Sequence, residues 1–320
     1  MLQSRTRREF LRNASLAAAG AMASFLPRSQ AQTSAGSPIV DTHVHVWTDD
    51  PARFPFANPY DDKFKPPAIA GTVERLLKEM DEFQIDNAVL VQMISHGWDN
   101  RYLAEVLRTH RARFRGQGLI DPTDPGRAER LAYWMQEHGL SGMRFSPIYY
   151  RDRDEWLNSR ESYPMWHKAE ELGAIFNFFI ATPQLPRLED MIQRFPRVRI
   201  VIDHLARVDL KGSKPEQEFE KLLRLARYPN VWAKVSELQI ISASKEFPYR
   251  DTFPYVQRLY DRFGGARLLW GTGFPGATRE QAGRLPLSKE LALVREELPF
   301  FTAEDRNKIL GLNALALWGF

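Results

Sequence analysis

The feature that most restricts the fold of this chain is a repeated alternation of short apolar segments with longer segments that carry apolar residues at helical spacing. The short segments are typical of buried strands, and the longer ones of amphipathic helices. The expected strands span residues 38–47, 85–92, 114–120, 140–146, 174–180, 198–204, 231–237 and 267–272. The expected helices span residues 73–84, 100–111, 126–138, 164–172, 184–195, 215–227, 252–263, 288–297 and 302–312. Strands that alternate with helices predict a parallel sheet with right-handed crossovers, and therefore an α/β protein.

Eight strand–helix units in a chain of this length fit a closed (β/α)8 barrel, the TIM barrel. The alternative is an open, doubly wound sheet. No glycine-rich phosphate-binding motif follows an early strand, which weakens that alternative. Nothing in the sequence indicates a second domain. We therefore expect residues 38–320 to form one barrel, preceded by a small polar linker at residues 32–37.

The N-terminus has the pattern of an export signal. Arg7 and Arg8 are adjacent and precede Phe10 and Leu11, an alanine-rich stretch follows at residues 14–25, and small residues surround a cleavage position after Ala31. The apolar stretch is too short to span a bilayer, which takes about 20 residues. We expect residues 1–31 to be a twin-arginine signal peptide, and the mature protein, without a membrane span, to reach the periplasm.

The charge and the cysteine content narrow the classes of partner. The formal net charge of the whole chain is +4 at pH 7, and residues 1–31 carry this excess, so the remaining residues are balanced. A balanced chain gives no indication of a nucleic-acid partner. The sequence has no cysteine, so disulfides and thiolate ligands are excluded, and a metal could be bound only by His, Asp, Glu or water.

The first expected strand carries two histidines. Polar and apolar residues alternate along it, which predicts Asp41, His43 and His45 on one face and the even-numbered residues, such as Thr42, on the other. Two imidazoles on one face of a strand can bind one metal ion or one ligand, or they can be hydrogen-bonded core residues with no chemical role. Their place on the first strand of the mature chain favours a site.

In a (β/α)8 barrel the active site lies at the carboxyl ends of the strands, which would bring residues from several strand ends together. The expected substrate-binding residues among them are Gln92, Arg144, Asn177, Arg207 and Lys234. Guanidinium groups pair with carboxylates or phosphates, so the arginines that follow strands four and six, Arg144, Arg151, Arg153 and Arg207, favour a small organic acid or a sugar-like lactone as substrate. Pairing of these arginines with nearby acidic residues is the alternative.

Three motifs, in order along the chain, resemble the amidohydrolase superfamily and most closely its amidohydrolase-2 branch, which contains lactonases and related bond-cleaving enzymes. The motifs are Asp41-Thr42-His43-Val44-His45, Val201-Ile202-Asp203-His204 and Leu269-Trp270-Gly271-Thr272-Gly273-Phe274-Pro275. The resemblance covers the whole mature chain and implies a distorted (β/α)8-barrel hydrolase. It implies that His43, His45 and His204 bind either a divalent metal, such as Zn or Mn, or the substrate carbonyl, since some lactonases of this branch work without metal.

The last motif departs from the pattern of the family it resembles. That pattern has an aspartate, the expected general base, where this chain has Gly273, and it has a glycine at the end of strand seven where this chain has Glu237. Neighbouring strands lie about 4.8 Å apart, so Glu237 could reach the space of the missing aspartate. Regular alternation opposes this, because Glu237 and Lys234 would then face opposite sides. The other interpretation of Glu237 is a solvated residue at the rim.

We therefore expect an exported hydrolase of the lactonase type. Water would attack a carbonyl group that is polarised by a metal or by the histidines, and His43, His45, His204 and Glu237 are the expected catalytic residues. Two alternatives remain: a degenerate barrel that binds a small anionic ligand without turnover, and a decarboxylase of the same family.

Overall fold

A computed structural model describes residues 36–150, 153–273, 278–281 and 283–320. The expected signal peptide at residues 1–31 and most of the expected linker at residues 32–37 lie outside the described residues. No helix in the described part of the chain is long and apolar enough to cross a membrane.

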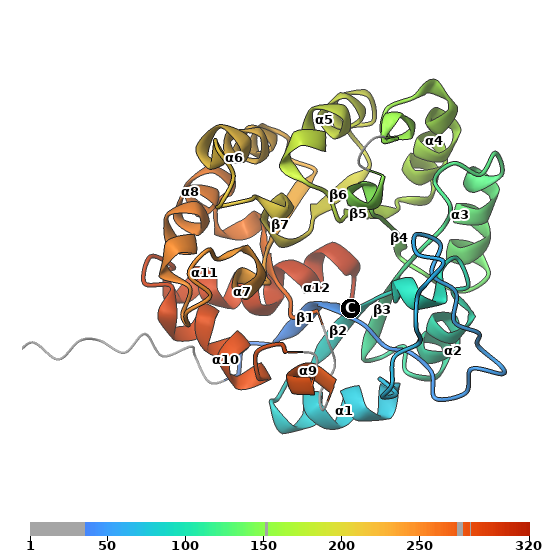
Figure 1. Cartoon of the computed structure of the whole chain (residues 1–320), viewed down its shortest axis with the longest axis horizontal. Coiled ribbons are helices and arrows are strands. Elements are labelled where there is room, and N and C mark those ends of the chain that lie inside the picture. Colours follow the sequence, from blue (N-terminus) through green and yellow to red (C-terminus); the bar gives the residue numbers. More distant parts are fainter. Residues whose placement is uncertain (1–35, 151–152, 274–277, 282) are drawn as a thin grey trace, which may run out of the picture. The chain divides into compact units, whose positions relative to one another are not determined.

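Eight parallel strands, paired in chain order, form a nearly closed barrel, which confirms the predicted (β/α)8 fold (Figure 1). The strands are β1 (Val40–Val44), β2 (Asn87–Val91), β3 (Phe114–Gly118), β4 (Gly142–Phe145), β5 (Ile175–Phe178), β6 (Arg199–Ile202), β7 (Val231–Val235) and β8 (Leu268–Trp270). Each lies within one expected strand, and each is shorter than expected because the ends of the apolar segments continue as loops.

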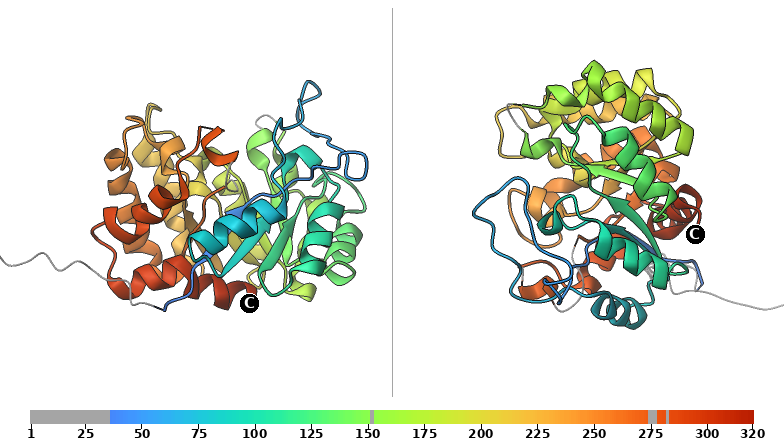
Figure 2. Two further views of the ribbon diagram at one scale, coloured as in Figure 1. Left: turned by 90° about the horizontal axis from the view of Figure 1, so that it is seen from below. Right: turned by 90° about the vertical axis from the view of Figure 1, so that its right-hand side faces the viewer.

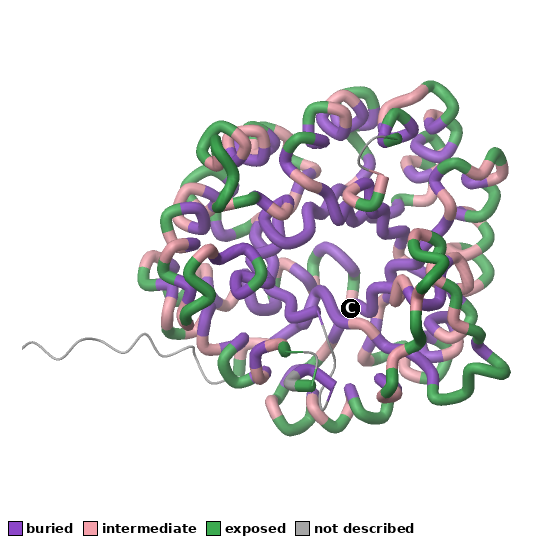
Figure 3. Tube along the Cα trace, in the orientation of Figure 1, coloured by how far each residue is buried: buried purple, intermediate pink, exposed green. Residues whose placement is uncertain are grey.

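Helices surround the strands, with their exposed faces outward (Figures 1 and 3). They are α1 (Val73–Glu82), α2 (Arg101–Thr109), α3 (Arg127–Gln136), α4 (Tyr163–Leu172), α5 (Leu185–Arg194), α6 (Pro215–Arg224), α7 (Leu238–Ile241), α8 (Phe253–Phe263), α9 (Thr278–Gln281), α10 (Leu287–Ala292), α11 (Ala303–Asn307) and α12 (Asn313–Trp318). The sequence did not predict α7 and α9, because four residues are too few to show a helical period.

The barrel closes between β8 and β1 through individual hydrogen bonds. The hydroxyl of Thr42 donates to the carbonyl of Trp270 over 2.5 Å, and the backbone N–H of Gly273 donates to the carbonyl of His43 over 2.5 Å. The carboxylate of Asp41 accepts from the backbone N–H of Thr272 at 3.0 Å. These bonds fix the carboxyl end of β1, and with it His43, against the end of β8.

An apolar layer fills the amino-terminal end of the barrel. It contains one residue from each of five strands, which pack against Ala314, Leu317 and Trp318 of α12. The five are Val40, Val89, Ile175, Val201 and Leu269. Figure 2 shows α12 at one end of the barrel and the long loop after β1 at the other. This apolar floor leaves the opposite end for polar residues.

The first strand does not alternate as the sequence predicted. All five of its residues are buried, and the pairing of β1 with β2 shifts register between Asp41 and Val44. Val40 therefore packs in the apolar layer while His43, an odd number of residues later, also lies inside the barrel. A bulge of this kind re-aims side chains near active sites. The prediction of two regular faces on this strand was wrong for that reason.

Candidate active site

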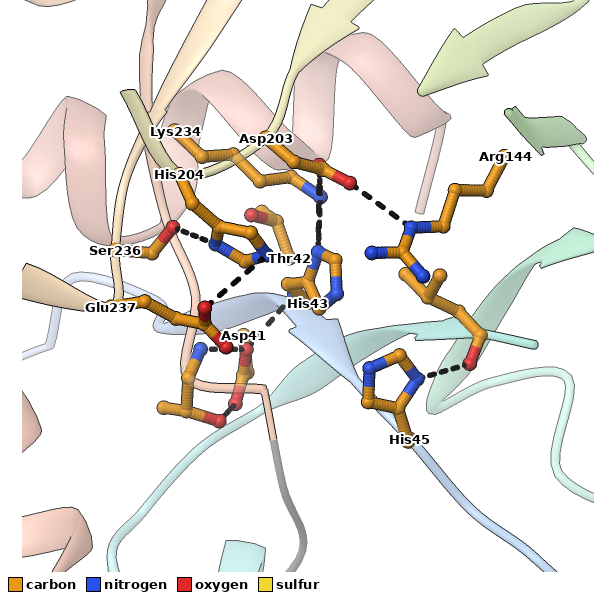
Figure 4. A network of polar contacts seen from close by, with 12 residues as sticks. Asp41, Thr42, His43, His45, Arg144, Asp203, His204, Lys234, Ser236 and Glu237 are labelled. Atoms are coloured by element: carbon orange, nitrogen blue, oxygen red, sulfur yellow. Dashed lines mark hydrogen bonds and ion pairs between the residues drawn. The ribbon is translucent and has the colours of Figure 1, made fainter. Parts of the chain in front are cut away.

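A pocket with a volume of about 160 Å³ lies at the carboxyl ends of the strands, and Figure 4 shows several of its lining residues. Three histidines line it, which we call the histidine cluster: His43, His45 and His204. Three arginines also line it, which we call the arginine group: Arg144, Arg207 and Arg284. The other lining residues are Met93, Ile94, Tyr149, Phe179 and Glu237. The pocket thus unites the four residues that the sequence predicted to be catalytic with two of those predicted to bind substrate.

Behind His43 lies a fully buried network of charges. Asp203 follows β6, and its Oδ1 lies 2.9 Å from Nζ of Lys234 and 3.4 Å from Nδ1 of His43. Its Oδ2 accepts from Nε of Arg144 at 3.2 Å. Nζ of Lys234 also contacts Nδ1 of His43 at 3.1 Å. One carboxylate thus joins two cations and one imidazole, and the network fixes the ring of His43.

The hydrogen bonds of His43 and His45 give the two rings different proton positions. A carbonyl oxygen only accepts, so Nδ1 of His45, which lies 2.8 Å from the carbonyl of Val91, carries the proton of a neutral ring, and its Nε2 is an acceptor. Nδ1 of His43 lies between the ammonium of Lys234 at 3.1 Å, which only donates, and Oδ1 of Asp203 at 3.4 Å, which only accepts. A neutral His43 that accepts from the nearer group, Lys234, carries its proton on Nε2. In that tautomer of His43, its ring offers the pocket a donor at Nε2, while the ring of His45 offers an acceptor.

The segment after β6 is a left-handed turn. The φ angles of its four residues, His204, Leu205, Ala206 and Arg207, lie between 48° and 50°, and none of them is glycine. Each such residue costs roughly 1–2 kcal/mol relative to the ordinary right-handed conformation. Backbone strain of this kind persists where the surrounding structure enforces it, often at functional sites. Here the turn presents its first and fourth side chains, His204 and Arg207, to the pocket.

Glu237 reaches the pocket because β7 ends before it. The strand stops at Val235, and Glu237 has φ 54° and ψ 35°, a left-handed conformation that breaks the alternation. Ser236 accepts or donates a 2.8 Å hydrogen bond at Nδ1 of His204, and Lys234 contacts His43, so three nearby residues of one segment serve the same site. Glu237 is 5% exposed, so it is not a solvated rim residue.

Burial keeps the histidine cluster neutral near pH 7. It lowers the pKa of His43 and of His204 well below 6.5, and the charge of Lys234 lowers the pKa of His43 further. Burial, with the nearby charge of Arg144, lowers the pKa of His45 to about 3. Neutral imidazoles can polarise or accept through hydrogen bonds but are weak bases with pKa values this low.

The buried carboxylate and ammonium are shifted as well. Burial opposes the charged form of Asp203, but the charge of Lys234 and the contact with the ring of His43 outweigh it and hold the pKa of Asp203 well below 3.8. Burial lowers the pKa of Lys234 from 10.5, and the charge of Asp203 opposes that change. Asp203 therefore stays ionised and holds its neighbours in place.

The pocket has an excess of positive charge. Three guanidinium groups and one carboxylate, that of Glu237, line it. Glu237 lies 3.0 Å from Nη1 of Arg207 and 3.1 Å from Nη1 of Arg284, whereas Arg144 pairs with Asp203 behind the histidines. The ring of Phe179 lies beneath two of the guanidiniums, 4.6 Å from Cζ of Arg144 and 5.0 Å from Cζ of Arg207. Such stacking orients guanidinium groups for recognition of an anion.

The described residues that come closest to forming a metal site are His43, Asp203 and His204, and their arrangement does not suit a divalent cation. Donor atoms of His43, Asp203 and His204 lie within 4.8 Å of one another; His45, which the sequence placed in such a set, is not among them. The ammonium of Lys234 already contacts two of the three residues, Asp203 at 2.9 Å and His43 at 3.1 Å. A divalent cation there would lie beside a buried positive charge that opposes it.

Three residues that the sequence predicted to bind substrate do not line the pocket. The side chain of Gln92 donates to the carbonyl of Asp99 at 2.6 Å and so holds the loop after β2. Asn177 is fully buried on β5, at the same level of the sheet as Arg144 of β4. Lys234, also predicted to bind substrate, is fully buried behind His43 and acts on the pocket through that ring.

The sequence did not single out three residues that belong to the site. Asp203 stood in a motif, but nothing in the motif revealed that its carboxylate joins Lys234, Arg144 and His43. Phe179 was part of an apolar strand, where a ring that supports two arginines looks like any core residue. Arg284 comes from the segment after β8, between α9 and α10, which shows no regular pattern.

The barrel, the pocket at the strand ends and the two histidines at the end of β1 define a class of protein, and comparison with known families identifies it. The chain belongs to the amidohydrolase family of the Amidohydro_2 model, which matches residues 40–320. The resemblance in the three sequence motifs is thus confirmed over nearly the whole of the described structure.

Three characterised relatives have lactone-related names. The chain is 27% identical to a 2-pyrone-4,6-dicarbaxylate hydrolase of Comamonas testosteroni over 244 residues, which cover 74% of this chain and 76% of that one. It is 26% identical to an L-fucono-1,5-lactonase of Burkholderia ambifaria, with 74% and 80% covered. It is also 26% identical to a 4-sulfomuconolactone hydrolase of Hydrogenophaga intermedia, with 87% and 88% covered.

Solved structures share the fold. A probable 2-pyrone-4,6-dicarboxylic acid hydrolase of Acinetobacter baumannii, crystallised with citric acid, superposes with a TM-score of 0.72 at 22% identity and covers 88% of this chain and 99% of that one. An amidohydrolase of Burkholderia multivorans with bound zinc gives the same TM-score at 19% identity, with 88% and 99% covered. At these identities the likeness concerns the fold.

Proposed function

We propose that the protein hydrolyses a small lactone that carries a carboxylate. The observation that supports this most is the pocket itself, where three guanidinium groups surround a cluster of three neutral histidines. A carboxylate satisfies guanidinium groups through charge-assisted hydrogen bonds. The names of the three characterised relatives, all hydrolases or lactonases, agree with ring opening as the reaction.

In this proposal different residues of the pocket bind the substrate, polarise its carbonyl group and hold the histidines in position. The arginine group binds the carboxylate of the substrate and orients the ring. Nε2–H of His43 donates to the carbonyl oxygen of the lactone, and the donor stabilises the negative charge that develops there when water attacks. His45 presents an acceptor at Nε2, suited to a hydroxyl or a water. Asp203 and Lys234 are positioning residues, since they act through His43.

The test is a panel of lactones with and without a carboxylate, for example 2-pyrone-4,6-dicarboxylate and δ-valerolactone. Turnover is measured as the release of acid on ring opening. We expect kcat/KM to be about 10- to 100-fold higher for the carboxylate-bearing lactones, roughly the contribution of one charge-assisted hydrogen bond. His43→Ala should lose at least 100-fold in kcat, because it removes the donor to the carbonyl oxygen. His167→Gln, which changes an exposed histidine of α4, is the control.

The outcomes separate the alternatives. Ring opening by the wild type that depends on His43 supports the proposal. Binding of the carboxylate-bearing lactones without any turnover would instead identify a non-catalytic barrel, and release of carbon dioxide from an intact ring would identify a decarboxylase.

A further inference from the structure

We propose that Glu237 is the general base of this hydrolysis, placed there by an exchange of side chains between the ends of β7 and β8. The inference rests on the proposed function and assigns the residue that activates water. Its evidence is the position of one carboxylate, the backbone that carries it, and the glycine that faces it.

Among the described residues that line the pocket, Glu237 is the one that carries a carboxylate. Its Oε2 lies 4.0 Å from Nε2 of His204, too far for a direct hydrogen bond but a separation that one water or one substrate oxygen can bridge. Ser236 holds the other ring nitrogen of His204, so Nε2 stays directed at Glu237 (Figure 4). Asp203, another nearby acid, is engaged behind the histidines by Lys234 and Arg144.

The backbone at Glu237 is one that a glycine would adopt without strain. At φ 54° a residue with a side chain costs roughly 1–2 kcal/mol relative to the ordinary conformation. The chain nevertheless has a glutamate there, and at 5% exposure it also bears the cost of burying a charge. Strain and burial at one residue point to a function that its side chain supplies.

Gly273, at the end of the neighbouring strand β8, has no side chain, and the carboxylate of Glu237 lies in the space beside it. Gly273 has φ 107°, and a Cβ atom at that position would lie 3.0 Å from Oε1 of Glu237. Such a contact is tighter than most contacts of a Cβ atom, so a side chain at this end of β8 would require the carboxylate of Glu237 to shift by a few tenths of an ångström. The hydrogen bond from the N–H of Gly273 to His43 keeps the strand end beside the cluster. The acid therefore reaches the reaction centre from β7 instead of β8.

The step that we assign is balanced with water as the only co-reactant. One O–H bond of the water breaks: its proton goes to the carboxylate of Glu237 and its oxygen bonds to the carbonyl carbon, while the π electron pair moves to the carbonyl oxygen. When that pair returns, the C–O bond of the ring breaks, and the leaving oxygen takes the proton from Glu237. The products are a carboxylic acid and a hydroxyl group, and Glu237 is again a carboxylate.

The arginines explain how a paired carboxylate becomes available. Arg207 and Arg284 hold Glu237 in the pocket at 3.0 Å and 3.1 Å. The carboxylate of a bound substrate would share these guanidinium groups and weaken their hold on Glu237. Binding of the correct substrate would thus release the base that acts on it.

The experiment compares Glu237→Gln and Glu237→Ala with the wild type on a lactone that the wild type opens. We expect kcat to fall 100- to 10,000-fold in both variants, the range for removal of a general base, with a smaller change in KM. Glu246→Gln, at an exposed position, is the matched control. The heat-unfolding midpoint of each variant reports whether it is folded.

Rescue by small anions separates a base from a partner of the arginines. Formate is basic and fits the space vacated in Glu237→Ala, whereas nitrate is also a small planar anion with one negative charge but is not a base. We expect formate to raise kcat of Glu237→Ala at least tenfold and nitrate to leave it unchanged. Equal rescue by nitrate, no rescue by formate, or a Glu237→Gln variant within threefold of the wild type would overturn the assignment. An inactive wild type would instead refute the proposed function.

Discussion

Asp203 holds two cations and an imidazole in the interior of the barrel, so its removal should be felt throughout the site. At an effective dielectric constant of about 20, an ion pair at 2.9 Å, the distance to Lys234, has a Coulomb attraction of about 6 kcal/mol, and one at 3.2 Å, the distance to Arg144, about 5 kcal/mol. Most of this is offset by the cost of burying the charges. Removal of one partner of such a buried pair typically lowers the stability by about 3–5 kcal/mol, because the other charges are left unpaired.

We expect Asp203→Asn to lower the free energy of unfolding by about 3–5 kcal/mol. The double variant Asp203→Asn/Lys234→Met should recover at least half of that loss, since it removes the unpaired ammonium, yet it should stay inactive because His43 loses both of its partners. Asp190→Asn breaks an exposed pair with Arg194 and should cost less than about 1 kcal/mol.

The measurements are urea unfolding at pH 7.5 and turnover of the same samples. A loss below about 1 kcal/mol in Asp203→Asn, equal to that of the surface control, would refute the reasoning. A double variant less stable than the single one would do so as well, because it would show that the ammonium does not depend on Asp203 for its place.

Three further predictions concern pH, metal and export. Because burial holds the pKa values of the histidine cluster below 6.5, the unfolded chain binds protons that the folded chain does not, so stability is full above about pH 7 and declines below pH 6.5. From pH 7.5 to 5.5 the loss should be about 4 kcal/mol in urea unfolding, and His45→Gln should reduce it by about a third; a flat profile contradicts this. Since the ammonium of Lys234 contacts His43 and Asp203, two of the three residues that could hold a metal, dialysis against EDTA should leave turnover within twofold. A loss of activity that Zn²⁺ or Mn²⁺ restores would disprove this. We also propose export by the twin-arginine route, so Arg7→Lys/Arg8→Lys should leave the full-length chain in the cytoplasm in cell fractionation, whereas an unchanged distribution counts against the route.

The fold could be predicted because its pattern is local and repeated. Each strand and most helices carry their own hydrophobic period, and eight repeats leave few possible architectures. Irregular points could not be predicted in this way. The register shift in β1 and the left-handed residues after β6 and β7 depend on contacts with other strands, and no period in the sequence reports them.

The same distinction, between local patterns and contacts across the fold, applies to the residues of the site. His43, His45, His204 and Arg207 were found because they occur at strand ends in spaced motifs. Glu237 could be proposed from its unusual place, but regular alternation argued against it until the end of β7 was seen to break that alternation. The role of Asp203, by contrast, follows only from three-dimensional contacts, because its partners come from three other strands.

The left-handed turn after β6 has a consequence for how this part of the chain can evolve. In a helical turn each residue advances by about 100°, so the first and fourth side chains lie near one side. Adding or removing one residue between His204 and Arg207 would rotate the arginine away from the pocket, whereas exchanging one intervening side chain for another of similar size would keep the spacing. The number of residues in this turn is therefore constrained more strictly than their identity, and insertions and deletions should be rarer here than substitutions.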